Sequence, residues 1–162
     1  MAFHFFKKPK LQIFAPVNGA VMSLEEVPDP VFSQRMMGEG VAMVPKEGNI
    51  FAPVQGKIIQ IAPTNHAIGI LADDGSEILI HIGLDTVNLK GKGFTVRVKE
   101  GDQVSVGQLL MEVDWEYLRE NDKSIITPIV ITNSLDSNKR YEIGDEKEGI
   151  VGETVIMTAS GK

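Results

Sequence analysis

The chain contains no cysteine, which excludes disulfide bonds, thiolate metal sites and a cysteine nucleophile. It contains no apolar run of the roughly 18 residues that span a bilayer. Lys7, Lys8 and Lys10 interrupt the N-terminus where a signal peptide would need an apolar core. There is no basic excess either, because the formal net charge is −6, so phosphate backbones would repel the chain. These absences predict a cytoplasmic protein that does not bind nucleic acid.

The remaining composition is that of one globular domain. With 162 residues, of which 43% are hydrophobic and 23% charged, the chain is long enough to bury a sizeable core. We expect a tail over residues 1–10 and a single domain over residues 11–162. The tail combines three phenylalanines with three lysines. It either leads passively into the first strand or rests weakly on an anionic membrane surface.

Short strands separated by turns dominate the sequence. Runs rich in Val, Ile and Phe are bounded by Gly, Pro, Asn and Asp. Examples of the expected strands are Lys57–Ala62, Ala67–Ala72, Glu77–Ile82, Gly107–Val113, Pro128–Thr132 and Thr154–Ala159. One short helix is expected over Asp114–Asn121, with Asp114 as its N-cap. The pattern predicts an all-β fold, namely a single antiparallel β-sandwich or barrel-like domain.

The sequence also contains an internal repeat. Phe14–Gly19 (FAPVNG) recurs at Phe51–Gly56 (FAPVQG), with five identities in six positions. A weaker likeness links Val106–Met111 with Val151–Met157. Repetition of one strand-and-turn unit within a domain of this size predicts a duplicated β framework.

A predicted hairpin brings two histidines together. Two apolar runs flank Asp73–Ser76, whose Asp-Gly pair favours a tight two-residue turn. With that pair at the centre of the turn, Ile68 lies opposite His81, and His66 becomes a diagonal neighbour of His81 about 7–8 Å away. The expected core face carries Ala67, Gly69, Leu71, Ile78, Ile80 and Ile82, and the expected histidine face carries His66, Ile68, Ile70, Leu79, His81 and Gly83.

Two adjacent histidines on an apolar face are suited to transferring a group. Imidazole is neutral and nucleophilic near pH 7. Phosphoryl transfer needs donors aimed at the phosphoryl oxygens, and a second histidine can be one of them. Thr64, two residues before His66, can fix the tautomer of that ring through its hydroxyl group.

Three other interpretations of the histidines stay open. Both can be half-buried structural side chains. They can supply two ligands of a zinc site, with Glu77 or Asp85 as a third. Their isoleucine-rich face can also be a docking surface without chemistry.

Several segments resemble one known family. Thr64–Gly69 (TNHAIG) and His81–Thr86 (HIGLDT) resemble the supporting-histidine and phosphorylation-site motifs of glucose-class enzyme IIA, a component of the bacterial sugar phosphotransferase system. Further similar segments, in the order and spacing of the family, are Val27–Gly40, Val87–Phe94, Lys99–Gln108 and Ile126–Asn133. The resemblance covers about residues 12–160 and implies an antiparallel β-sandwich.

The resemblance implies a phosphoryl carrier. His81 would accept a phosphoryl group from the phosphocarrier HPr and pass it to a cysteine on the IIB domain of a glucose-type permease. His66 would stabilise the phosphoryl oxygens, while Thr64 and Gly83 would hold the two rings. No cofactor is required, and contact with the membrane would pass through the permease.

The resemblance and the predicted histidine face together define a docking surface for the two partners. Its expected residues are Asp29 and Asp85 at an acidic rim, and Val31, Phe32, Ile68, Ile70 and Leu79 in an apolar centre. An acidic rim steers basic partners and speeds transient encounters. The alternative function is a regulatory or zinc-binding protein that uses the same face without phosphoryl transfer, with zinc bridging the two histidines to a partner's carboxylate.

Overall fold

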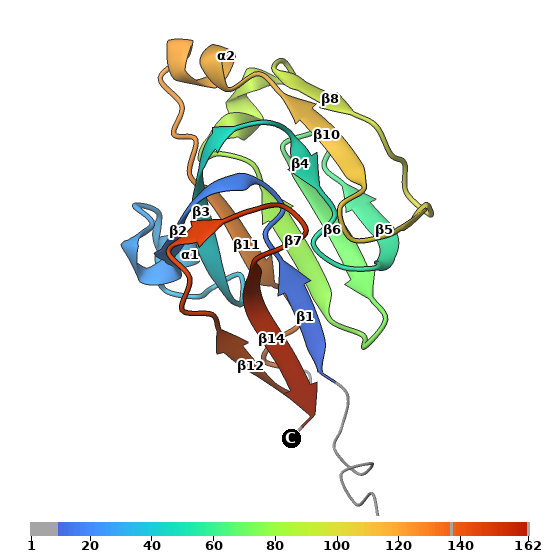
Figure 1. Ribbon diagram of the computed structural model, residues 1–162. Coiled ribbons are helices and arrows are strands. Elements are labelled where there is room, and N and C mark those ends of the chain that lie inside the picture. Colours follow the sequence, from blue (N-terminus) through green and yellow to red (C-terminus); the bar gives the residue numbers. More distant parts are fainter. Residues whose placement is uncertain (1–9, 137, 162) are drawn as a thin grey trace, which may run out of the picture.

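The computed structural model describes residues 10–136 and 138–161, and strands make up most of it (Figure 1). The largest sheet has eight strands, in the order β13 (Glu148–Gly149), β2 (Asn18–Ser23), β3 (Glu39–Glu47), β11 (Thr127–Ile131), β7 (Glu77–His81), β6 (Ala67–Ala72), β5 (Gly56–Ile61) and β9 (Gln103–Val104). Two three-stranded sheets have the orders β1 (Leu11–Phe14), β14 (Val155–Gly161), β12 (Lys139–Ile143) and β4 (Ile50–Phe51), β10 (Leu109–Val113), β8 (Phe94–Val96).

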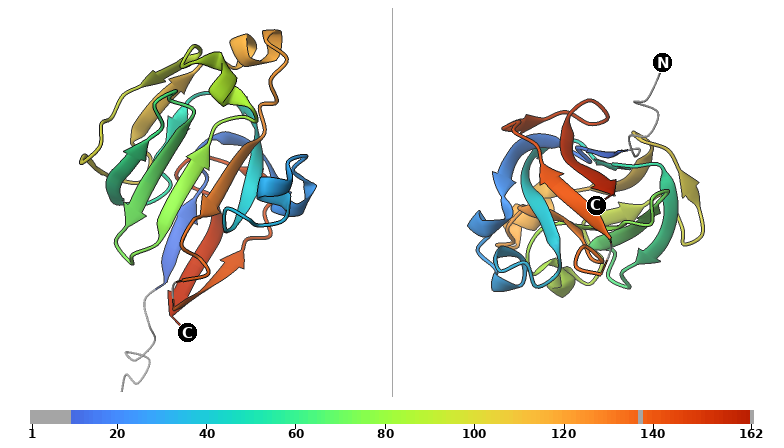
Figure 2. Two further views of the ribbon diagram at one scale, coloured as in Figure 1. Left: turned by 180° about the vertical axis from the view of Figure 1, so that it is seen from behind. Right: turned by 90° about the horizontal axis from the view of Figure 1, so that it is seen from below.

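The strands form the two layers of an antiparallel sandwich. Each pairing between the described strands is antiparallel. Seen from behind, β5, β6, β7 and β11 lie in front of β1 and β14, and seen from below the strands surround the interior (Figure 2). The predicted all-β sandwich is therefore confirmed.

The internal repeat is a structural duplication. The N–H of Phe14 donates to the carbonyl of Pro53 (2.9 Å), and the N–H of Phe51 donates to the carbonyl of Pro16 (2.8 Å), so the two copies bond to each other reciprocally. In the large sheet, β13-β2-β3-β11 and β9-β5-β6-β7 run in the same order from edge to centre and meet where β11 pairs with β7. The predicted duplication is confirmed.

Two short α-helices are present in the described chain, where the sequence predicted one. The predicted helix is α2 (Trp115–Glu120), and the side chain of Asp114 caps it by accepting the N–H of Tyr117 (3.0 Å). The second helix, α1 (Pro30–Ser33), follows Asp29 as N-cap and has proline in its first turn. A helix of four residues is too short to show helical periodicity, and for this reason it was missed.

The turn between β6 and β7 has three loop residues rather than two. The N–H of Ala72 donates to the carbonyl of Ser76 (2.9 Å), and the N–H of Gly75 donates to the carbonyl of Ala72 (3.0 Å). Gly75 has a φ of +93°, the left-handed conformation that a three-residue hairpin loop uses at its third position. The predicted register is therefore wrong by one residue.

This register moves the side chains of β6 to the other face relative to those of β7, because side chains alternate along a strand. Ile78, Ile80 and Ile82 lie in the main core as predicted, whereas Ala67, Gly69 and Leu71 lie on the opposite face. Ala67 pairs with His81, and Ile68 pairs with Ile80. The core face carries Ile68, Ile70, Ile78 and Ile80, all at most 1% exposed. The opposite face carries Ala67, Gly69, Leu79 and His81, so His81 lies on the outside of the sandwich.

Buried residues form two clusters, and the smaller one supports the outer face of the large sheet. The larger cluster fills the space between the layers. The smaller cluster consists of Leu24, Val27, Phe32, Ala42, Ala67, Leu79, Leu84 and Val130. The strand residues of this smaller cluster alternate with residues of the main core, so they lie on the outer face of β3, β11, β7 and β6. Leu24, Val27 and Phe32, from the segment that contains α1, cover that face. His81 lies on the same outer face, beside this segment.

No helix within residues 10–136 and 138–161 is both long and apolar enough to cross a bilayer. Residues 1–9 of the predicted tail lie outside the described residues. Weak contact between that tail and a membrane surface stays a prediction.

Candidate functional site

His81 is the last residue of β7, and the loop that follows fixes its ring. Nδ1 of His81 lies 2.8 Å from the carbonyl oxygen of Gly83. A carbonyl only accepts, so Nδ1 carries the proton and donates it. The other ring nitrogen, Nε2, is then unprotonated and keeps its lone pair free. The local structure therefore holds His81 in the tautomer that a nucleophile needs.

Gly83 occupies a position that no other residue can fill without strain. Its φ is +76°, and a Cβ built on it would lie 2.5 Å from Cγ2 of Thr86 and 2.8 Å from the carbonyl oxygen of Ser124. The Thr86 hydroxyl is buried and donates to the carbonyl of Ile82 (2.6 Å). The carbonyl that orients His81 is thus held in a tightly packed loop.

His66 is placed by a different loop, between β5 and β6. Nδ1 of His66 lies 2.7 Å from the hydroxyl oxygen of Thr64, which can donate or accept. The His66 carbonyl accepts the N–H of Ile82 (2.7 Å), which anchors this loop to the end of β7. The two segments that carry the histidines are therefore joined by their backbones.

The two imidazole rings are in contact. Their centroids lie 5.0 Å apart with an interplanar angle of 78°, an edge-to-face arrangement. The ring of Phe32 lies on another side of His81, with centroids 5.1 Å apart and an angle of 60°. The prediction that the two histidines are neighbours is therefore confirmed. The hairpin register on which that prediction rested is nevertheless wrong.

The environment keeps both rings neutral near pH 7. Burial lowers the pKa of His66, and the charge that His81 would carry lowers it further. Burial also lowers the pKa of His81, opposed in part by its hydrogen bond to Gly83 and by the negative charges of Asp29 and Asp85. Two neutral imidazoles, one of them with a free Nε2, are therefore in contact near pH 7.

A shallow cavity of about 190 Å³ opens beside His81. It is lined by Asp29, Val31, Phe32, Met37, His81, Asp85, Thr86 and Val87. Val31 is 38% exposed and Val87 is 49% exposed. Two carboxylates and two exposed valines therefore border the reactive ring, as a docking surface with an acidic rim requires.

Four of the apolar residues predicted for the docking surface lie deeper than expected. Ile68 and Ile70 are completely buried in the main core, so placing them on this surface is wrong, as a result of the register error. Phe32 is 3% exposed and Leu79 is 8% exposed. Phe32 packs against the ring of His81, Leu79 belongs to the smaller buried cluster, and neither is itself an open contact surface.

Thr86, Val87 and Met37 line the cavity but were not predicted as site residues. Val87 and Met37 line the cavity from a 3₁₀ turn (Thr86–Leu89) and from the segment after α1. Both segments are irregular, so no periodicity predicts which side chains face outward. Thr86 carried a usable signal, because a threonine hydroxyl can donate to the carbonyl four residues earlier, which here is that of Ile82.

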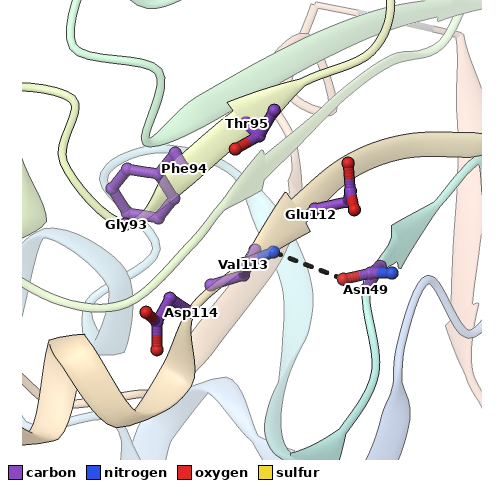
Figure 3. Close-up of a pocket in the computed structure, with 7 residues that line it drawn as sticks. All are labelled: Asn49, Gly93, Phe94, Thr95, Glu112, Val113 and Asp114. Carbon is purple, nitrogen blue, oxygen red and sulfur yellow. Dashed lines mark hydrogen bonds between the residues drawn. The ribbon is translucent and has the colours of Figure 1, made fainter.

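A larger cavity lies elsewhere and has no comparable chemistry. Its volume is about 560 Å³, and it is lined by Asn49, Gly93, Phe94, Thr95, Glu112, Val113 and Asp114 (Figure 3). Asn49 accepts the N–H of Val113 there (3.4 Å). Both acids have structural partners, since Glu112 pairs with Arg97 and Asp114 caps α2. The histidine pair is therefore the reactive candidate.

Metal binding by this chain alone has little support. No group of three or more His, Asp or Glu side chains within the described residues could hold a metal ion. Glu77 and Asp85 therefore do not complete a site with His66 and His81. A zinc ion at the histidines would need ligands from a partner, and this stays a prediction.

The fold and the site together define a class of protein: a small antiparallel β-sandwich that presents a pair of orthogonal histidine rings beside an acid-rimmed docking cavity. Residues 11–137 match the family described as phosphoenolpyruvate-dependent sugar phosphotransferase system, EIIA 1. The chain belongs to this family and is an EIIA component of the sugar phosphotransferase system.

Similar proteins cover nearly the whole chain. A PTS system glucose-specific EIIA component of Halalkalibacterium halodurans is 49% identical over 146 residues, which are 90% of this chain and 84% of that protein. One from Staphylococcus epidermidis is 47% identical over 147 residues, 91% of this chain and 88% of that protein. The solved structure of glucose permease IIA from Mycoplasma capricolum is similar with a TM-score of 0.85 and 39% identity, covering 93% of this chain and 96% of that one.

Proposed function

We propose that this chain is a phosphoryl carrier that accepts a phosphoryl group from HPr on Nε2 of His81 and passes it to the IIB cysteine of a glucose-type permease. The observation that carries the proposal is the hydrogen bond from Nδ1 of His81 to the carbonyl of Gly83. It leaves Nε2 as the free nucleophilic nitrogen in a ring whose burial lowers its pKa. Glucose is the sugar named for the similar proteins.

The transfer consists of two exchanges at one nitrogen. In the first, the bond between phosphorus and its donor atom on HPr breaks as the lone pair of Nε2 forms a phosphorus–nitrogen bond. In the second, the IIB thiolate attacks the phosphorus, the bond to Nε2 breaks, and the electron pair returns to the ring. The Nδ1 proton stays on the bond to Gly83 throughout. Such transfers depend mainly on positioning and on charge stabilisation.

His66 supplies charge stabilisation. When the hydroxyl of Thr64 donates to Nδ1 of His66, the proton of the neutral ring resides on Nε2. An N–H on a ring 5.0 Å from that of His81 can donate to an oxygen of the transferred group. His66 therefore supports the transfer without accepting the group, and Thr64 sets the tautomer.

The rim of the cavity suits transient partners with basic, partly apolar surfaces. Asp29 and Asp85 lie close enough to His81 to raise its pKa, although burial outweighs them. Val31 and Val87 supply exposed apolar contact between these carboxylates. Acidic residues around an apolar centre accelerate encounter with oppositely charged partners without making the complex long-lived.

Intact-mass spectrometry tests the proposal. The chain is incubated with phosphoenolpyruvate, enzyme I and HPr, then analysed at alkaline pH to preserve phosphohistidine. We expect a gain of one phosphoryl group, absent in His81→Ala and present in His66→Ala. No gain in the wild-type chain, with donors that phosphorylate another carrier in a parallel reaction, would overturn the proposal.

A further inference from the structure

We infer that Asn65 is a positioning residue for His66, because its left-handed backbone conformation aims the His66 ring at His81. The expected effect of Asn65 on phosphoryl transfer rests on the proposed function, whereas its effect on the orientation of the His66 ring does not. Asn65 lies between Thr64 and His66 in the turn that joins β5 to β6 (Figure 1). Its φ is +59°, which is uncommon for a residue other than glycine.

The loop must reverse the chain within four residues. The N–H of Ala62 donates to the carbonyl of Ala67 (3.0 Å), which closes the hairpin around residues 63–66. Within it, the N–H of Asn65 donates to the carbonyl of Ala62 (2.8 Å), so a β-turn has its central residues at 63 and 64. Only residues 65 and 66 remain to return the chain to β6. A left-handed residue at 65 makes that return possible.

This conformation decides where the His66 ring points. Ala67 pairs with His81 on the outer face, and Ile68 is buried in the core. If β6 extended regularly to residue 66, strand alternation would direct that side chain toward the core side, as for Ile68. The ring instead lies 5.0 Å from the ring of His81. The loop backbone, not the strand, therefore places His66.

The hydrogen bond between Thr64 and His66 spans Asn65 directly. The hydroxyl oxygen of Thr64 and Nδ1 of His66 are 2.7 Å apart, with one residue between their backbones. Their separation thus depends on the φ and ψ of Asn65, which lie on the backbone path between the two side chains. A change of sign in that φ would move the hydroxyl group away from the ring.

The backbone of Asn65, rather than its amide group, carries this role. Within the described residues the Asn65 side chain makes no hydrogen bond, and it lies near Gly91, where a built Cβ would be 3.7 Å from its Nδ2. Asparagine is one of the few residues with a side chain that adopt the left-handed region readily. Glycine adopts it as readily, whereas a β-branched residue does not.

Three variants test the inference. Asn65→Gly keeps the left-handed conformation and removes the amide, and Asn65→Val opposes the conformation. Gly152→Val introduces the same conflict at a remote turn after β13, where φ is +72° and a Cβ would meet nothing within 4 Å. We expect Asn65→Val to slow transfer from the phosphorylated chain to IIB at least tenfold, because displacing a positioned group by about 1 Å can cost roughly 100-fold. Asn65→Gly and Gly152→Val should transfer at nearly the wild-type rate.

Proton NMR of the unphosphorylated variants supplies a second readout that does not depend on transfer. The cross-relaxation between the His66 and His81 rings should persist in Asn65→Gly and Gly152→Val and disappear in Asn65→Val. A folded Asn65→Val that keeps this signal and the wild-type transfer rate would overturn the inference, as would an Asn65→Gly that loses both. If the wild-type chain accepts no phosphoryl group, the proposed function fails while the ring contact still tests the role of Asn65.

Discussion

Nδ1 of His81 and the carbonyl oxygen of Gly83 are 2.8 Å apart, and this bond assigns the free lone pair of the ring to Nε2. The carbonyl can hold the ring because its own residue is fixed. Gly83 has a left-handed φ, and a Cβ built on it would clash with Thr86 and with the carbonyl of Ser124. A catalytic group is positioned well when its supporting residues are themselves locked by packing.

Gly83→Ala should destabilise the fold and misplace His81. The new Cβ would lie 2.5 Å from Thr86 Cγ2, and overpacking together with the left-handed φ predicts a loss of about 3 kcal/mol in the free energy of unfolding. Gly101→Ala, which meets the same backbone conflict in open space, should cost about 1 kcal/mol. Urea denaturation measures both, and equal losses would contradict the steric account.

Acid should weaken the fold through the histidines. The pKa values of His66 and His81 in the folded state lie below the ordinary value of 6.5. The unfolded state therefore binds more protons once the pH falls below about 6.5, so the stability present above that pH is lost as the pH falls through the folded pKa values.

Chemical denaturation between pH 8 and pH 5 measures this loss. The double variant His66→Gln, His81→Gln should lose less stability over that range, because both histidines are absent while the carboxylates remain. Parallel pH profiles for the two proteins would show that the histidines titrate alike in the folded and unfolded states.

His66→Ala should separate acceptance of the phosphoryl group from its donation. The nucleophile remains, so the mass gain should persist. Transfer to IIB should slow by about 100-fold, because one donor to the phosphoryl oxygens is lost. Rapid-quench measurement of transfer from the phosphorylated chain checks this, and transfer at the wild-type rate would show that His66 has another role.

Thr64→Val should produce a smaller defect of the same kind. Valine is similar in shape to threonine but lacks the hydroxyl group that lies 2.7 Å from Nδ1 of His66. Without that group the ring populates both tautomers, and transfer to IIB should slow by about tenfold. Thr64→Ser retains a hydroxyl and should restore most of the rate. Nitrogen-15 NMR of the His66 ring reports the tautomer directly, and an unchanged tautomer in Thr64→Val would exclude this explanation.

Six strands, α2 and the duplication were predicted from the sequence, whereas the register of the hairpin between β6 and β7 was predicted wrongly. An Asp-Gly pair fits a two-residue turn, and a glycine at the third position fits a three-residue turn. One extra loop residue shifts the pairing by one and moves the side chains of β6 to the other face relative to those of β7. A better guide was available in Ile68, Ile70, Ile78 and Ile80, since four β-branched side chains on one face favour the core.

The contact between His66 and His81 was predicted correctly because two errors, one in the hairpin register and one in the position of His66, compensated for each other. The true register moves His81 to the face opposite Ile68, and the loop then carries His66 to that same side. Strand periodicity says nothing about a residue in a four-residue loop, so the position of His66 depended on the conformation of Asn65. The resemblance placed Asp29, Val31, Phe32 and Asp85 on the docking surface, and all four line the cavity in the structure.

Replacing the acidic rim should slow encounter with HPr without changing the fold. Asn is a good N-cap, so Asp29→Asn keeps the cap that accepts the N–H of Val31. Asp85 has a φ of +58°, which asparagine adopts readily, so Asp85→Asn is also conservative. The double variant should lower kcat/KM for phosphorylation by HPr several-fold at low ionic strength, because steering depends on these charges.

Salt and a charge-matched control separate steering from other effects. At about 0.5 M salt the double variant and the wild type should converge, since screening removes the attraction between exposed charges. Glu146→Gln with Glu153→Gln removes the same formal charge from exposed positions near β13, on the far edge of the large sheet. If that control slows phosphorylation as much as the rim variant, net charge rather than the rim governs encounter, and the acidic rim has no specific role in docking.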